Sequence, residues 1–182
     1  ALPGPAGAQQ QRVSIYTAHT ANIVERLIPE FEKATGIKAD VVKAGSGDII
    51  NRVRAEAANP KADVIWSIGA ELLEANMDLL EAYQPKEYAM IADAFKTTGP
   101  WLPYTGILNV FVVNTKKLKP EEYPKTWMDL AQPRFKNLVS MADAEKSGSA
   151  YMQLNTFLTI YGDKPAGWDK FKEVYKNLSV SA

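Results

Sequence analysis

Residues 13–50 read VSIYTAHTANIVERLIPEFEKATGIKADVVKAGSGDII, and this stretch decides the fold. Apolar and polar residues alternate over Val13–Thr17, which is typical of a strand. Helical spacing of apolar residues follows over 22–35, then a strand over 37–43 and a helix over 49–58. Because strands and helices alternate with short connections, the sequence predicts an α/β fold built from right-handed βαβ units with a parallel sheet.

The first predicted helix carries its own boundary signals. Thr20 is the expected N-cap and Gly36 the expected stop. Pro29 lies inside the helical pattern, and it predicts a kink or a local break because proline lacks the backbone N–H.

Further elements are predicted downstream. The apolar run ADVIWS predicts a strand over 62–67 that is buried on both faces. The composition of residues 71–82 is helical, and ILNVFVVN predicts a strong strand over 107–114 that leads into a second lobe. The remaining expected elements are a short amphipathic turn at 127–130, a strand over 138–142, and helices over 149–161 and 168–178.

Three segments rich in Ser, Thr and Gly stand directly before predicted helices: 17–20, 45–48 and 147–149. A helix N-terminus has unpaired N–H donors and a partial positive charge, so it favours an anion. Two of these segments, with 67–70, follow predicted strands, where ligands bind in open parallel sheets. The alternative interpretation is ordinary helix capping, with Asp48 as the cap of the second segment.

Single side chains also leave two interpretations open. His19 stands beside the first helix, where it would either donate to an anion or coordinate a metal, or would contact no ligand at all. The helix dipole favours its neutral form. Aromatic residues either form a wall of a ligand site or pack in the core: Trp101, Tyr104, Trp127 and Tyr151.

Composition excludes several classes of site. The 182 residues have a net charge of zero, no Cys and one His, which excludes disulfides, thiolate chemistry and multi-His metal clusters. Nothing recommends nucleic acid as a partner, and no cofactor, metal site or catalytic residue is predicted. Ala6-Gly7-Ala8 has the form of a signal-peptidase site, which predicts export; a flexible tail is the alternative.

Motifs along the chain resemble one family. They are PEFEKATGI at 29–37, GSGD at 45–48, NPKADVIWS at 59–67, GILNVFVVNT at 106–115, PKTWMDL at 124–130 and MADAEKSGSAY at 141–151. The combined pattern is similar to extracellular solute-binding proteins of ABC importers, in the ferric, thiamine and polyamine branch, and most of all to the AfuA-type sugar-phosphate binders.

The resemblance implies a type II periplasmic-binding-protein-like fold, with two lobes and mixed sheets. A signal-peptide remnant or flexible tail over 1–12 would precede lobe 1 at 13–105, and 106–182 would hold the hinge strand and an incomplete second lobe. The implied partners are a small anionic solute, bound in a cleft between the lobes, and an inner-membrane permease, with the protein in the periplasm. The implied ligand-binding residues are Thr17, His19, Ser46, Gly47, Ser67, Ser147, Gly148 and Ser149.

Two departures from the family pattern shape the alternatives. Ferric binders have a carboxylate at the position of Ile68 and a His one residue later than His19. The sequence therefore argues against ordinary iron binding, which stays the second hypothesis for the ligand. Family members are longer, which implies a missing C-terminal segment or an abnormal assembly. A phosphate-handling enzyme is the hypothesis from another class, with His19, Asp48 and Asp143 available for chemistry.

Overall fold

The computed structural model describes residues 10–181, which form two compact units that divide after Ile68. The lobe boundary predicted between residues 105 and 106 differs from this division, because it assigns residues 69–105 to the first lobe. The proposed signal-peptide remnant lies outside the described residues. Each unit is described by itself.

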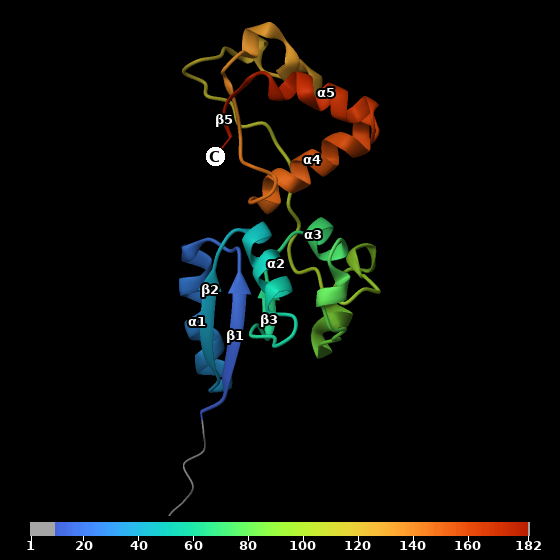
Figure 1. The fold of residues 1–182 in the computed structure, drawn as a ribbon. Helices are drawn as coiled ribbons and strands as arrows, with labels where there is room; N and C mark the ends of the chain where they lie inside the picture. Colours follow the sequence, from blue (N-terminus) through green and yellow to red (C-terminus); the bar gives the residue numbers. More distant parts are fainter. Residues whose placement is uncertain (1–9, 182) are drawn as a thin grey trace, which may run out of the picture. The chain divides into compact units, whose positions relative to one another are not determined.

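The first unit is a three-stranded parallel sheet with two helices (Figure 1). In chain order its elements are β1 (Arg12–Thr17), α1 (Ala21–Thr35), β2 (Lys38–Lys43), α2 (Ser46–Ala55) and β3 (Val64–Trp66). The strand order is β2-β1-β3, so the chain crosses first to one side of β1 and then to the other. Right-handed crossovers in opposite directions place α1 and α2 on opposite faces of the sheet. The predicted βαβ units and parallel sheet are confirmed.

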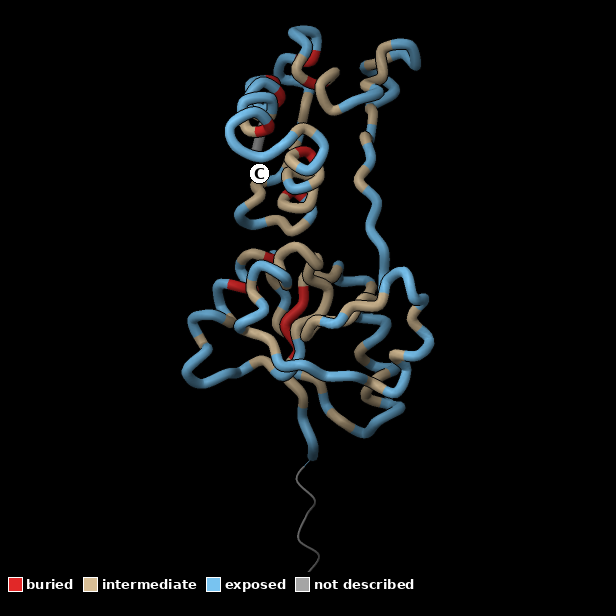
Figure 2. Tube along the Cα trace, turned by 90° about the vertical axis from the view of Figure 1, so that its right-hand side faces the viewer, coloured by how far each residue is buried: buried red, intermediate tan, exposed pale blue. Residues whose placement is uncertain are grey.

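The central strand β1 lies at the core of this unit. Ile15, Tyr16 and Thr17 are buried, and α2 contributes the buried Ile49 and Ile50 (Figure 2). The helix predicted for this region begins at Ser46, three residues earlier than expected, so the Ser46-Gly47 pair belongs to its first turn.

Three local expectations for the first unit need correction. Strand β3 is not buried on both faces: Val64 is 43% exposed, because β3 is an edge strand of the described sheet. Thr20 stands at the N-cap of α1, but its hydroxyl donates to Asn22 instead of accepting a backbone N–H. Helix α1 is continuous through Pro29, so the local break does not occur, and it ends as expected at Gly36, which has a left-handed φ of 72°.

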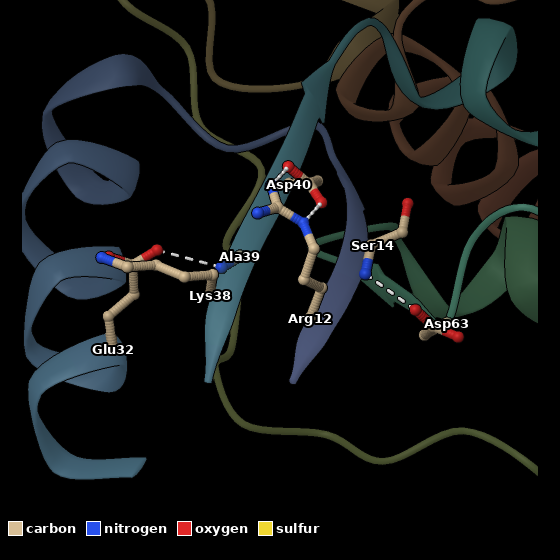
Figure 3. A network of polar contacts seen from close by, with 7 residues as sticks. All are labelled: Arg12, Ser14, Glu32, Lys38, Ala39, Asp40 and Asp63. Carbon is tan, nitrogen blue, oxygen red and sulfur yellow. Dashed lines mark hydrogen bonds and ion pairs between the residues drawn. The ribbon is translucent and has the colours of Figure 1, made fainter. Parts of the chain in front are cut away.

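At the edge of the sheet where the strands begin, carboxylates accept hydrogen bonds from neighbouring strands (Figure 3). Asp40 pairs with Arg12 across β1 and β2, and this guanidinium lowers the pKa of the Asp40 carboxyl. Glu32 of α1 accepts from Lys38 Nζ at 2.7 Å and from the backbone N–H of Ala39 at 2.9 Å. Both bonds lower the pKa of Glu32, and the bond from Lys38 has the larger effect. Together they link α1 to the edge strand β2.

The second unit contains α3 (Ala70–Glu74), β4 (Val139–Met141), α4 (Gly148–Tyr161), α5 (Ala166–Tyr175) and β5 (Leu178–Ser181). Strands β4 and β5 pair in parallel with a bulge between Val139 and Ser140. All strand pairs of the described residues are thus parallel. The expected mixed sheets also need antiparallel pairs, and residues 10–181 contain none. Short 3₁₀ turns connect the elements at Met77–Leu79, Lys86–Met90, Asp93–Phe95, Pro120–Glu122, Trp127–Ala131 and Pro133–Phe135.

Aromatic side chains make the core of the second unit. Phe157 of α4 is fully buried, and it lies 5.9 Å from Trp127 and 5.3 Å from Phe171 between ring centroids. The buried Asn177 links the start of β5 to the turn at 127–131 beside this core. Its Nδ2 donates to the carbonyl oxygens of Leu130 at 2.8 Å and Gln132 at 2.9 Å. The core interpretation of Trp127 is therefore confirmed.

Two predicted elements of this unit do not form as expected. The helix over 71–82 is limited to α3 and one 3₁₀ turn. Residues 107–114 form no strand, although their residue types favour one; Leu108 is 87% exposed and Val112 93% exposed. A strand requires a hydrogen-bonded neighbour, and this segment pairs with no other part of residues 10–181.

The Glu32→Ala variant tests the link between α1 and β2. Because the pKa of Glu32 is lowered in the folded protein, folding favours its ionised form. Its contribution is complete above the unfolded value of 4.5 and is lost as the pH falls through the lowered pKa. We expect a lower urea midpoint than wild type at pH 7 and a smaller difference at low pH. Glu30→Ala on the exposed side of α1 is the control, and an equal effect of both substitutions contradicts the prediction.

The Asn177→Ala variant tests the polar link beside the second core. It leaves two carbonyl oxygens without their donor, at a cost of about 2 kcal/mol in the free energy of unfolding. Urea unfolding followed by Trp fluorescence measures this loss. The exposed Asn155→Ala is the control, and a loss no larger than its own argues against the assignment.

Candidate functional site

The candidate site is the edge of the first unit's sheet where its three strands end. The register pairs Thr17, the last residue of β1, with Lys43 of β2 on one side and with Trp66 of β3 on the other. Backbone bonds continue past the strand ends, from Ala44 N–H to the Thr17 carbonyl at 3.2 Å and from Ala18 N–H to the Trp66 carbonyl at 3.4 Å. The three loops that follow the strands therefore start from one edge.

The N-terminus of α2 opens at this edge without a side-chain cap. Its N-cap is Gly45, not Asp48, so the capping alternative stated for Asp48 is wrong. The first helical hydrogen bond is donated by Ile49 to the Gly45 carbonyl at 2.9 Å. The amides of Ser46, Gly47 and Asp48 precede it, and no side chain caps them.

Ser46 adds a hydroxyl to these amides. The residue is only 7% exposed, and its hydroxyl has no hydrogen-bond partner among residues 10–181. Every fully enclosed side-chain N or O atom in this described part does have a partner, so the Ser46 oxygen retains contact with solvent. A mostly buried hydroxyl with an open oxygen at a helix N-terminus is suited to hydrogen-bond an anion.

Thr17 and His19 shape the loop after β1. Thr17 is fully buried, and its hydroxyl accepts the backbone N–H of His19 at 3.1 Å, so this side chain organises the loop from inside. The imidazole of His19 contacts Trp66 edge to face, with ring centroids 4.5 Å apart. Burial lowers the pKa of His19, which keeps the ring neutral as predicted, although the prediction assigned the cause to the helix dipole.

Ser67 has an uncommon backbone conformation at the end of β3. Its φ of 66° is in the left-handed region, which residues other than glycine seldom adopt. Such conformations concentrate at functional sites, where the surrounding structure maintains them. Ser67 follows Trp66 directly, so this turn directs the chain away from the sheet edge beside His19.

The second unit carries the third segment. Ser147 is the N-cap of α4, and its hydroxyl accepts the Ala150 N–H at 3.4 Å, which agrees with the capping interpretation. Gly148 and Ser149 are the first helical residues, and Ser149 is exposed. Their role in ligand binding stays a prediction.

The structure thus gathers five of the predicted residues at one edge of the first unit: Thr17, His19, Ser46, Gly47 and Ser67. Trp66 was missed. The sequence did carry a signal for it, because Trp66 lies near the end of a predicted strand. The last side chains of parallel strands border the ligand crevice.

The chemistry of this edge is mainly that of hydrogen-bond donation. It presents backbone amides, serine hydroxyls and a neutral imidazole, and the exposed charged side chains of Lys43 at the end of β2 and Asp48 in the first turn of α2 stand beside them. Within the described residues, no group of three or more His, Cys, Asp and Glu side chains is arranged to hold a metal ion. None of the described helices combines the length and hydropathy needed to cross a membrane.

Comparison with known proteins identifies the family. Residues 59–182 match the model of the bacterial extracellular solute-binding proteins, which is more than half of the chain. The chain therefore belongs to this family. The fold is that of periplasmic binding proteins, as its solved relatives show.

Several relatives cover most of this chain, and the names of some of them record a ligand. A protein of Haemophilus influenzae is 36% identical over 98% of this chain and 54% of its own length. The Fe(3+)-binding periplasmic protein of Serratia marcescens is 27% identical over 90% of this chain and 49% of its own. The solved periplasmic binding protein AfuA of Actinobacillus pleuropneumoniae, with fructose-6-phosphate bound, is 30% identical with a TM-score of 0.82 and covers 96% of this chain and 57% of its own. The chain spans about half the length of these relatives.

The single histidine makes its titration directly observable. Because burial disfavours the imidazolium, we expect the C2 proton of His19 to titrate in NMR spectra with a pKa below 6.5. The neutral form contributes to stability above pH 6.5, and this contribution is lost as the pH falls through the lowered value. A titration midpoint at or above 6.5 in the ligand-free protein would refute this.

Proposed function

We propose that this chain is part of the solute-binding component of an ABC importer, which captures a small anionic solute outside the inner membrane and delivers it to a permease. The solute class is a sugar phosphate or an organophosphonate. The observation that carries the proposal is the uncapped N-terminus of α2 with the open hydroxyl of Ser46. A phosphate or phosphonate group accepts several hydrogen bonds at once, and it is favoured by the positive end of the helix dipole.

The relatives support this class of solute. AfuA was solved with fructose-6-phosphate bound, and a relative from Salmonella typhimurium, 29% identical over 76% of this chain, is a putative 2-aminoethylphosphonate-binding periplasmic protein. Export to the periplasm is proposed on the same ground, because the names of these relatives place them there. In this proposal the chain binds and releases its solute without chemical conversion.

The matched ferric-binding relatives keep iron as the second candidate. At the edge of the first unit, however, the groups are mostly hydroxyls, amides and one imidazole, with the carboxylate of Asp48 in the first turn of α2, whereas Fe³⁺ prefers several anionic oxygen ligands. Ile68, at the position where the family pattern of ferric binders has a carboxylate, supplies none. Anion capture therefore uses the groups on this edge better than iron binding does.

The Ser46→Ala variant tests the proposal by calorimetry with fructose 6-phosphate on the intact natural protein. Loss of one hydrogen bond to a charged group costs about 1.5–3 kcal/mol, so the dissociation constant should rise at least tenfold. Ser140→Ala, an exposed serine of β4, is the control and should bind like wild type.

Three results would count against these assignments. Equal affinity of the Ser46→Ala variant and wild type removes Ser46 from the site. Failure of wild type to bind sugar phosphates and phosphonates, together with a tyrosinate-to-iron absorption band after ferric loading, favours the iron-binding alternative. Turnover of any bound phosphate ester would favour an enzyme instead.

A further inference from the structure

A buried tyrosine ties the sheet to the far end of α2. Tyr16 of β1 is 1% exposed, and its hydroxyl donates to Glu56 Oε2 at 2.9 Å. Glu56 is the C-cap of α2, and its other oxygen accepts from Arg52 Nε, also at 2.9 Å. The Arg52 guanidinium lies 4.6 Å from the centre of the Tyr16 ring. We call Tyr16, Arg52 and Glu56 the tyrosine anchor.

The anchor fixes the position of α2 along its own axis. The buried apolar residues of the helix are Ile49 and Ile50, and apolar contacts of this kind have no preferred direction. A hydrogen bond requires a defined separation and angle. The bond from Tyr16 to Glu56 therefore resists sliding of the helix along the sheet, and the contact with Arg52 holds Glu56 in place.

This axial position determines where the N-terminus of α2 stands at the sheet edge. Ten residues, about 15 Å of helix, separate Glu56 from Ser46. A helix moves as a rigid rod, so a shift at Glu56 is transmitted to the open amides of Ser46 and Gly47. Tyr16 also directly precedes Thr17, whose carbonyl and hydroxyl hold the loops before α2 and after β1.

We propose that Tyr16 and Glu56 are positioning residues for anion binding, although neither lies at the edge that receives the ligand. The anchor holds the hydroxyl of Ser46 and the first amides of α2 in one orientation before the anion arrives. Because bonds to an anion weaken steeply with misplacement, a rigid N-terminus binds more tightly than a sliding one. This inference rests on the proposed function of the α2 N-terminus.

The test is Tyr16→Phe in the intact natural protein, which keeps the ring and removes one oxygen. We expect binding of fructose 6-phosphate to weaken about three- to tenfold, the range of one ordinary hydrogen bond. Glu56→Gln retains an acceptor for the Tyr16 hydroxyl and should lose less affinity than Glu56→Ala. Tyr83→Phe removes the hydroxyl of a tyrosine that is 75% exposed and is the matched control.

A double-mutant cycle separates positioning from general loss of stability. If Tyr16 acts through Ser46, the Tyr16→Phe substitution should weaken binding less in a Ser46→Ala background than in wild type. Additive losses of binding free energy would overturn the inference, since a general structural defect weakens both backgrounds equally.

A second readout needs no ligand and separates this inference from the proposed function. In the ligand-free protein, Tyr16→Phe should shift the NMR amide resonances of Ser46 and Gly47, whereas Tyr83→Phe should not. Unchanged resonances overturn the positioning role. Shifted resonances in a protein that binds no sugar phosphate support the anchor and count against the proposed function alone.

Discussion

The parallel register of β1 with both of its neighbours is the constraint on which the first unit depends. Thr17 is paired with Lys43 on one side and with Trp66 on the other, so all three strands end in one row. Had either neighbour slipped by one residue, its side chains would have changed faces. The common end of the strands is what turns three separate loops into one edge.

Apart from the exposed side chains of Lys43 and Asp48, this edge owes its polarity to dipoles. Its amides and hydroxyls are fixed by the backbone, and burial keeps His19 neutral. These amides and hydroxyls can donate hydrogen bonds to an anion without gaining or losing a proton, but they act only over short distances. Their placement is therefore critical, and carboxylates at the other edge of the sheet and the tyrosine anchor beneath α2 both restrain it.

Local patterns predicted most elements of both units because their signals are complete within a few residues. Gly36 ends α1, helical spacing located α4 and α5, and the turn at 127–130 was recognised. The failure over residues 107–114 has a clear cause, which is dependence on a pairing partner. Residues 107–114 have the composition of a strand, yet a strand exists only where another chain segment accepts its hydrogen bonds. Trp66 was missed although its place at the end of a predicted strand could be read from the sequence, and its contact with His19 is visible only in the folded structure.

The sequence by itself determined the alternation of strands and helices, the parallel sheet and the Ser- and Gly-rich segments before the helices, because each follows from spacing and residue type. Only the tertiary structure decided that Gly45 and not Asp48 caps α2, that Ser67 takes a left-handed conformation and that Tyr16 reaches Glu56. The physical reason is that these features depend on distances between segments 40 residues apart in the chain, as for Tyr16 and Glu56, or on backbone angles imposed by surrounding structure.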